Sequence, residues 1–217
     1  MSMRYIMRLK NVKNAKNIIE EGKYYINNPC DYKGKWNELF QNDNPIYLEI
    51  GMGKGKFILE NALQNTDINY IGIEKYDSVL VRAIQKTNQF DLNNLKLIKL
   101  DALNLSTIFD KEIDLIYLNF SDPWPKERHQ KRRLTSYIFL DIYDKIFKNK
   151  AHITMKTDNL NLFNYSISSL KENGYKIIYT TNDLKKENIP NITTEYEEKF
   201  NNLNIKINML EAIKEKE

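Results

Sequence analysis

The residues best suited to chemistry lie in one stretch, 119–133, which reads Asn-Phe-Ser-Asp-Pro-Trp-Pro-Lys-Glu-Arg-His-Gln-Lys-Arg-Arg. Its carboxylate, Asp122, follows an apolar run and is followed by Pro123 and Pro125, which restrict the backbone. An aromatic ring, Trp124, comes next and is followed by a run of cations. A carboxylate, a planar ring and clustered cations within so few residues indicate a site that acts on nucleic acid.

The net charge of +4 is distributed unevenly along the chain. Five of the eight residues in 126–133 are cations, and the first sixteen residues contain five cations and no acid. The remainder of the chain is therefore net acidic. An acidic body with two basic segments favours focused attraction of a polyanion. For the N-terminal segment, a merely solvated charged surface remains an equal alternative.

Length and composition predict a single globular domain. Of 217 residues, 41% are hydrophobic and 29% are charged, which are ordinary values for a folded protein. One cysteine excludes an internal disulfide, and one cysteine with two distant histidines gives no zinc-site spacing, so we expect no metal. No apolar run has the form of a signal peptide or membrane span. We expect a cytoplasmic protein without a membrane partner.

The elements that must position these residues alternate between strand and helix from Pro45 onward. Such alternation predicts an α/β fold with a doubly wound, mostly parallel, Rossmann-like sheet and one antiparallel strand near the C-terminus. We expect a basic arm and capping segment in 1–40, whose first 22 residues form either a mobile arm or a short helix around 16–21, and the main domain in 41–217. Strands are predicted at 46–50, 69–74, 95–100, 113–120, 151–155, 175–181 and 203–210, with helices over 57–63, 79–84, 138–147 and 160–170.

Three glycines, Gly51, Gly53 and Gly55, cluster at the end of the first strand and predict a sharp turn that a ligand can approach closely. The dinucleotide fingerprint would require glycine where Lys56 stands. A carboxylate, Glu49, lies in the strand end, where its charge opposes a pyrophosphate. A cationic ligand such as S-adenosylmethionine suits it, and a nicotinamide dehydrogenase is disfavoured.

Two further acids end the next two strands. Glu74 is placed to accept hydrogen bonds from a ribose diol, and Asp101 from an adenine amino group. Either acid alone has a simpler interpretation as a helix N-cap. Together with Glu49 they form a series of acids at three successive strand ends beside the glycine loop, which favours a cofactor pocket.

At this point the sequence resembles the bacterial tRNA (guanine(46)-N7)-methyltransferase family. The resemblance runs in order from about Tyr24 to Phe200, and its most specific part is the Asp-Pro-Trp-Pro-Lys block with the basic run that follows. The glycine loop alone would indicate only a methyltransferase. The motifs that carry the resemblance are Leu-Glu-Ile-Gly-Met-Gly-Lys-Gly-Lys-Phe at 48–57, Gly-Ile-Glu at 72–74, Asp-Ala at 101–102, Asn-Phe-Ser-Asp-Pro-Trp-Pro-Lys at 119–126, Arg-His at 128–129 with Lys-Arg-Arg at 131–133, and Thr-Glu-Tyr-Glu-Glu-Lys-Phe at 194–200.

The resemblance implies a class I methyltransferase fold, S-adenosylmethionine as cofactor and tRNA as partner, with N7 of a variable-loop guanine as the methyl acceptor. The cofactor side would be lined by Glu49, Gly51, Gly53, Gly55, Glu74, Asp101 and Asp122. The substrate side would be lined by Lys126, Asp158, Thr194, Glu195, Tyr196 and Glu197. RNA would contact Arg128, His129, Gln130, Lys131, Arg132 and Arg133. Monomer and homodimer are both compatible with the sequence.

Guanine N7 carries an in-plane lone pair, so the acceptor needs no general base. We therefore expect Asp122, the candidate catalytic residue, to align the guanine and to stabilise developing positive charge. Trp124 either packs on a base or covers the core, and Asp158 either contacts substrate or caps the following helix. Tyr196, predicted in a late polar loop, would stack on the extruded base or anchor that loop. Two rival functions remain: methylation of another RNA position, and a non-catalytic RNA-binding module.

Overall fold

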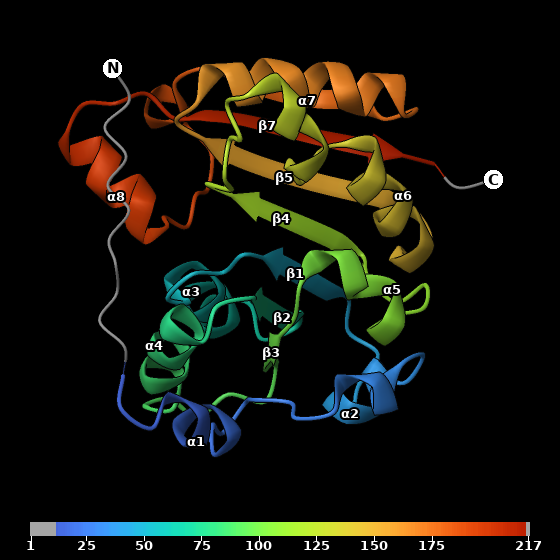
Figure 1. The fold of residues 1–217 in the computed structure, drawn as a ribbon, viewed down its shortest axis with the longest axis vertical. Coiled ribbons are helices and arrows are strands. Elements are labelled where there is room, and N and C mark those ends of the chain that lie inside the picture. Colours follow the sequence, from blue (N-terminus) through green and yellow to red (C-terminus); the bar gives the residue numbers. More distant parts are fainter. Residues whose placement is uncertain (1–11, 216–217) are drawn as a thin grey trace.

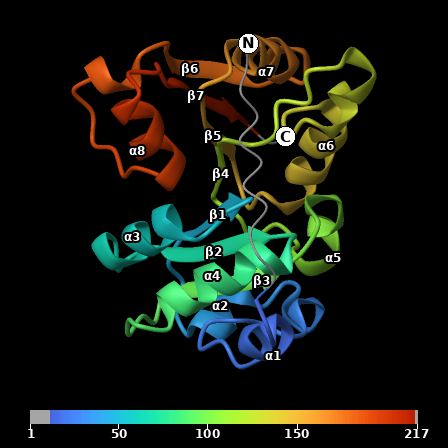
Figure 2. The same ribbon diagram turned by 60° about the vertical axis from the view of Figure 1, so that its left-hand side comes forward.

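The computed structural model describes residues 12–215, which contain a seven-stranded sheet in the order β3-β2-β1-β4-β5-β7-β6 (Figures 1 and 2). Neighbouring strands pair in parallel except at β7, which is antiparallel to both β5 and β6. This is the predicted doubly wound, mostly parallel sheet with one antiparallel strand. The strands are β1 Ile46–Ile50, β2 Asn69–Glu74, β3 Leu95–Lys99, β4 Leu115–Asn119, β5 Ala151–Thr157, β6 Lys176–Thr181 and β7 Asn208–Lys214.

Helices pack on both faces of the sheet because each parallel crossover returns over one face. The helices are α1 Ala15–Glu20, α2 Trp36–Phe40, α3 Lys56–Gln64, α4 Asp77–Thr87, α5 Leu105–Ile108, α6 Tyr137–Ile146, α7 Leu160–Glu172 and α8 Glu195–Asn202. One apolar cluster packs α1, α3 and α4 against one side of β1–β3. A second cluster packs α2, α5, α6 and α7 against the other side of these strands and against β4, β5 and β7. None of these described helices has the length and apolar character to cross a membrane.

The chain reverses its winding direction between β1 and β4. From β1 it proceeds outward through β2 and β3, and it then returns to pair β4 with the other side of β1. At such a switch point the helices leave to opposite faces and open a crevice beyond the carboxyl ends of the two strands. The glycine loop follows β1 and the segment containing Asp122 follows β4, so the fold brings both motifs to this crevice.

The segment before β1 covers the outer edge of the sheet, where Tyr25 pairs with Leu97 of β3, and then packs α2 against the end of α5. Trp36 is fully buried, and its indole N–H donates to the carbonyl oxygen of Ile108 at 2.8 Å. Its ring contacts Phe109 with a centroid distance of 5.2 Å. Trp36 and Phe40 both belong to the apolar core of the sheet. The predicted basic arm lies mostly outside the described residues, which begin at Val12.

Two local predictions near the C-terminus were wrong. The segment containing Tyr196 is helix α8 rather than a polar loop, and the last strand begins at Asn208 instead of residue 203. Thr194 caps α8 by accepting a hydrogen bond from the N–H of Glu197 at 2.9 Å. Acidic residues fill the first helical turn, where the helix dipole favours negative charge. The Thr-x-x-Glu spacing is a sequence pattern that predicts the start of a helix at this position.

Candidate active site at the carboxyl edge of the sheet

The glycine loop after β1 has the conformation that its glycines predict. Gly51, Gly53 and Gly55 have φ angles of 76°, 60° and 75°, in the left-handed region that residues with a Cβ rarely adopt. A Cβ added at Gly51 or Gly53 would meet no atom within 4 Å, whereas at Gly55 it would lie 3.0 Å from the Cβ of Ala83. The first two glycines therefore border open space, and the third permits close helix packing.

Glu49 lies near the carboxyl end of β1 and is 2% exposed. Its Oε1 accepts a hydrogen bond from Asn119 Nδ2 at 3.0 Å, which joins the ends of β1 and β4. Glu49 Oε2 and Asn119 Oδ1 are both buried without a hydrogen-bond donor. Burial raises the pKa of Glu49 to about 7, although the Asn119 hydrogen bond opposes the shift. Two adjacent acceptors without donors fit a ligand that brings N–H groups, best of all a cation.

Glu74 connects the end of β2 to the glycine loop. Its Oε1 accepts from the N–H groups of Lys75 and Tyr76 at 2.8 and 3.0 Å. Its Oε2 accepts from the Gly53 N–H at 3.2 Å. Burial raises the pKa of Glu74, opposed by these backbone hydrogen bonds, and the charge of Asp122 raises it further. Glu74 thus holds the loop and lies within electrostatic reach of Asp122.

Asp101 follows β3 and is the N-cap of a short 3-10 turn. This agrees with the simpler interpretation of Asp101 as a cap. Its Oδ1 accepts from the Leu103 N–H at 3.1 Å, and its Oδ2 pairs with Lys75 Nζ. Burial raises the pKa of Asp101, but the hydrogen bonds from Lys75 and Leu103 outweigh it, and the pKa falls below its usual value. Asp101 is therefore ionised at neutral pH. A capping role and a ligand contact are compatible because the carboxylate keeps further acceptor sites.

Asp122 lies exposed in the turn that follows β4. The residues on either side bend this turn sharply, since Phe120 and Trp124 have φ angles of 51° and 42°. A non-glycine residue in this region costs about 1–3 kcal/mol and persists only where its surroundings hold it. Arg133 supplies part of that support: its Nε donates to the Pro123 carbonyl at 3.0 Å and its Nη2 to the Trp124 carbonyl at 3.1 Å.

Arg133 therefore corrects one expectation about the basic run. It is only 7% exposed, and its guanidinium packs over the Tyr165 ring at 4.3 Å from the centroid. This side chain stabilises the turn from inside the protein instead of facing a phosphate. The exposed cations of the run are Lys126, Arg128, Lys131 and Arg132.

Trp124 has its own partners within the basic run. Arg132 lies over the indole at 4.9 Å from the ring, and His129 meets it edge-on at a centroid distance of 5.8 Å. Desolvation, followed by the positive charges of neighbouring Arg and Lys side chains, lowers the pKa of His129. Trp124 is half-buried and belongs to neither core cluster, so the interpretation that it covers the core is wrong.

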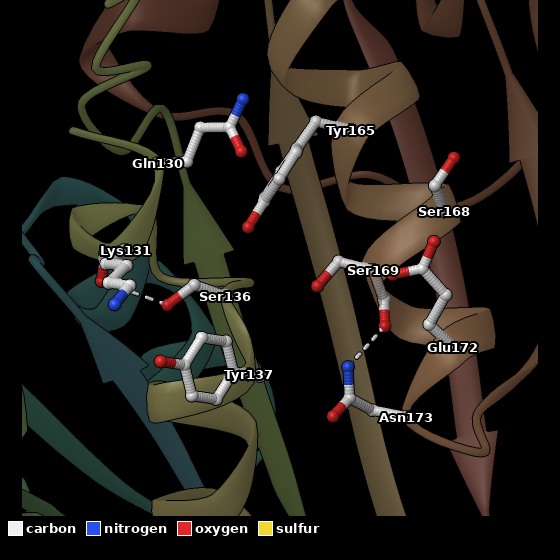
Figure 3. Close-up of a pocket in the computed structure, with 9 residues that line it drawn as sticks. All are labelled: Gln130, Lys131, Ser136, Tyr137, Tyr165, Ser168, Ser169, Glu172 and Asn173. Atoms are coloured by element: carbon white, nitrogen blue, oxygen red, sulfur yellow. Dashed lines mark hydrogen bonds between the residues drawn. The ribbon is translucent and has the colours of Figure 1, made fainter. Parts of the chain in front are cut away.

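A groove of about 400 Å³ lies beside the basic run (Figure 3). One wall consists of the basic run and the start of α6, and the other wall is the side of α7. Gln130 and Lys131 form part of one wall, and Tyr165 and Ser168 of α7 form part of the other. Two of the expected RNA-binding residues thus border this groove.

The substrate-side residues separate into exposed and buried groups. Asp158 is exposed and does not cap α7, because Asn159 Oδ1 accepts from the Leu162 N–H at 2.8 Å and is the cap. Tyr196 is 55% exposed. Thr194 and Glu197 are 5% and 2% exposed, so both face the protein interior.

Glu195 pairs with Lys86 Nζ at 2.6 Å, and Glu197 Oε2 pairs with Lys156 Nζ at 3.0 Å. Three residues at this site escaped the sequence analysis as individual candidates: Asn119, Phe120 and Lys156. Asn119 could have been found from the sequence, because it ends a predicted strand that lies beside the strand of Glu49. Lys156 had none, because its partners are distant in sequence.

Comparisons with known proteins agree with this geometry. A family model described as "Putative methyltransferase" matches residues 43–210. The chain is 47% identical to the tRNA (guanine-N(7)-)-methyltransferase of Lachnoclostridium phytofermentans, over 97% of this chain and 100% of that protein. It is 50% identical to the protein of the same name from Bacillus subtilis, over 86% of this chain and 88% of that protein.

Solved structures with similar folds share little sequence with this chain. A SAM dependent methyltransferase from Aquifex aeolicus has a TM-score of 0.56 at 13% identity, covering 92% of this chain and 98% of that chain. The 16S rRNA methyltransferase KamB has a TM-score of 0.63 at 12% identity, covering 84% and 94%. At such identities the likeness concerns the fold alone.

The different environments of the two adjacent arginines predict different effects on stability. Arg133→Met removes two hydrogen bonds from a charged donor to half-buried backbone, and we expect it to lower the free energy of unfolding by about 2–4 kcal/mol. Arg132→Met, the matched control, removes an exposed cation–π contact and should cost about 0.5–1 kcal/mol. Urea unfolding followed by tryptophan fluorescence measures both, and equal losses would contradict the internal role of Arg133.

Proposed function

The chain belongs to the tRNA (guanine-N(7)-)-methyltransferase family, and from that membership we propose that it transfers the methyl group of S-adenosylmethionine to N7 of guanine 46 in tRNA. The acceptor guanine would lie in the variable loop, and the product would be 7-methylguanosine. We also propose that residues 41–217 form the catalytic domain and that 1–40 serve as arm and cap. The observation that carries the proposal is the pair of buried acceptors, Glu49 Oε2 and Asn119 Oδ1, that lack donors beside the glycine loop.

The residues around the crevice fit S-adenosylmethionine. The ammonium group of its amino-acid end would supply the hydrogen-bond donors that Glu49 Oε2 and Asn119 Oδ1 lack. Open space above Gly51 and Gly53 leaves room for the ligand backbone. When bound, this cofactor supplies an electrophilic methyl group on a sulfonium. Glu74 and Asp101 follow the next two strands in order, which supports their proposed contacts with ribose and adenine.

Asp122 is the proposed catalytic residue, and its role is alignment together with charge stabilisation. The guanine N7 lone pair is free at neutral pH, so no proton has to leave before the new bond forms. Asp122 would accept hydrogen bonds from guanine N1 and N2 and would orient N7 toward the methyl group. Methylation makes the purine positively charged, and the Asp122 carboxylate stabilises that charge as it develops. The strained turn between Phe120 and Trp124, tied by Arg133, holds this carboxylate in place.

The proposed RNA surface consists of the exposed part of the basic run and the groove beside it. Lys126 and Asp158 would meet the target nucleotide near the crevice, with Tyr196 stacked against the base. The phosphate contacts would come from Arg128, Lys131 and Arg132, with His129 and Gln130 as further backbone contacts. The substrate assignment distinguishes this function from methylation of another guanine or another RNA, which the same cofactor site would also support.

Incubation with labelled S-adenosylmethionine and unmodified tRNA tests the proposed reaction. We expect methyl incorporation at N7 of guanine 46, detected by chemical cleavage at 7-methylguanosine. Asp122→Ala should abolish turnover while tRNA affinity stays within about twofold, because this residue aligns the base and does not contact phosphates. Incorporation at a different position would refute the substrate assignment. Normal turnover by Asp122→Ala would refute the mechanism.

Cofactor affinity should depend on pH through Glu49. Its raised pKa, about 7, means that the free protein is largely protonated here at pH 6 and largely ionised at pH 7.5. Only the ionised carboxylate attracts an ammonium group, so affinity should rise about eightfold across this range. Titration calorimetry with S-adenosylhomocysteine, which keeps the ammonium group, measures this affinity at each pH. Glu49→Gln should bind the ligand weakly and equally at every pH, whereas the control variant Glu60→Gln should keep the wild-type pH dependence. A wild-type affinity that does not change with pH would contradict the assignment of Glu49 to the ammonium group.

The RNA surface predicts a strong salt dependence. If the four exposed cations of the run each neutralise one phosphate, with Lys126 on the phosphate of the target nucleotide, tRNA affinity should fall roughly a hundredfold between 50 and 200 mM salt. Replacing Arg128 and Arg132 together by glutamine should remove about half of the slope of log affinity against log salt. Lys35 and Lys148, which border a small cavity beside Glu112 at the other edge of the sheet, give the matched double control. A control that flattens the slope equally would refute the assigned surface.

A further inference from the structure

Lysines from three different elements hold the segment that leads into α8. Lys56, the first residue of α3, donates to the carbonyl and hydroxyl oxygens of Thr193 at 3.2 and 3.1 Å. It also pairs with Glu198 at 2.9 Å. Lys86 of α4 and Lys156 of β5 pair with the two other acids of the first helical turn. The segment 191–198 is therefore tied to α3, α4 and the sheet at once.

Lys156 differs from the other two lysines by its burial. Its side chain is 4% exposed, compared with 18% for Lys56 and 34% for Lys86. Its Nζ donates to Glu197 Oε2 at 3.0 Å, to the Ile192 carbonyl at 2.9 Å, and to Asn191 Oδ1. All three N–H groups of this ammonium are thus used inside the protein. A buried ion pair surrounded by such hydrogen bonds fixes geometry, and it resists screening by salt.

The backbone of the same residue holds the other side of the site. The carbonyl oxygen of Lys156 accepts a hydrogen bond from the Phe120 N–H at 2.8 Å. Phe120 is the residue with a φ angle of 51° at the start of the Asp122 turn. One residue of β5 therefore positions both the strained turn after β4, through its backbone, and the start of α8, through its side chain.

These two contacts bring two aromatic rings together. Phe120 and Tyr196 are stacked, with centroids 6.0 Å apart and planes inclined by 23°. Phe200 lies against both rings, at 5.7 and 6.2 Å. Tyr196 remains 55% exposed. Burial raises the pKa of its phenol, and the charge of Asp122 is the next contribution, so the phenol lies within electrostatic reach of the proposed catalytic carboxylate.

We propose that Lys156 is a positioning residue: through Glu197 it sets Tyr196 on Phe120, and this ring pair forms the platform on which the acceptor guanine stacks. The inference rests on the proposed function and deepens it. Glu197 is predicted from the sequence to contact the substrate. In the structure it is buried against Lys156, so it supports the ring pair from inside the protein. The platform restrains the plane of the base, and the Asp122 carboxylate restrains its rotation within that plane. Together they fix the direction of the N7 lone pair, which in-line methyl transfer requires.

The test compares Lys156→Met, Tyr196→Ala and the combination of both. Each single change should lower kcat for tRNA methylation about thirtyfold, while KM for tRNA changes less than threefold and S-adenosylhomocysteine affinity less than twofold. Because Lys156 acts through Tyr196, the combined variant should be no slower than the slower single variant. Lys214→Met is the matched control, since Lys214 also pairs with a half-buried acid, Asp144, and lies over an aromatic ring at a distant point of the sheet.

Losses of kcat that multiply in the combined variant would overturn the inference, because they would show independent roles. An equal loss of kcat in Lys214→Met would also overturn it. Wild-type protein that is inactive on tRNA would refute the proposed function itself. Active wild-type protein with an equally active Lys156→Met variant would refute only the positioning role.

A second variant covers the case in which Lys156→Met fails to fold because Glu197 is left buried without a partner. Replacing Lys156 and Glu197 together by methionine removes both charges and should keep the melting temperature. Methionine cannot donate to the Ile192 carbonyl or to Asn191, so kcat should remain low, and backbone amides of 191–198 should exchange hydrogen faster. Wild-type kcat in this double variant would overturn the inference.

Discussion

The hydrogen bond between Glu49 and Asn119 is the interaction on which the site depends, because it joins the two strands at the switch point of the sheet. It leaves one acceptor on each partner buried and unpaired, which costs free energy in the ligand-free protein. The raised pKa of Glu49 expresses the same cost: the folded protein retains a proton that the unfolded chain would release near pH 4.5. The apolar core on both faces offsets this cost, and a cationic ligand would remove it.

Cations perform two separate tasks in this protein, and burial decides which. Arg133, Lys156 and Lys56 point inward and donate to backbone carbonyls and to buried acids, so they shape the turn after β4 and the start of α8. The exposed cations of the basic run keep their water and are available to phosphates. The inward group costs more to assemble, since each charge gives up hydration, but it provides fixed geometry near the reacting atoms. The outward group provides attraction that salt can screen.

Positioning at this site comes from elements far apart in the chain. Asp122 lies in a turn held by Arg133, the glycine loop is held by Glu74, and α8 is held from three directions. A methyl transfer to an unprotonated nitrogen needs alignment more than proton transfer, so a site built largely of such supports suits that chemistry.

The sequence by itself determined the strand and helix alternation, the parallel sheet, and the placement of Glu49, Glu74, Asp101 and Asp122 at strand ends. These features depend on local periodicity and turn residues, which act within about ten neighbouring positions. Only the tertiary structure decided that Arg133 and Glu197 face inward and that Lys156 connects Glu197 to the turn after β4. Their partners lie across the sheet or on another element. From the sequence alone, these charged residues are therefore predicted to lie on the surface. Helix α8 lies between these cases: its Thr194 cap was legible, but its acidic face resembled a solvated loop because the three lysines that pair with it are distant in sequence.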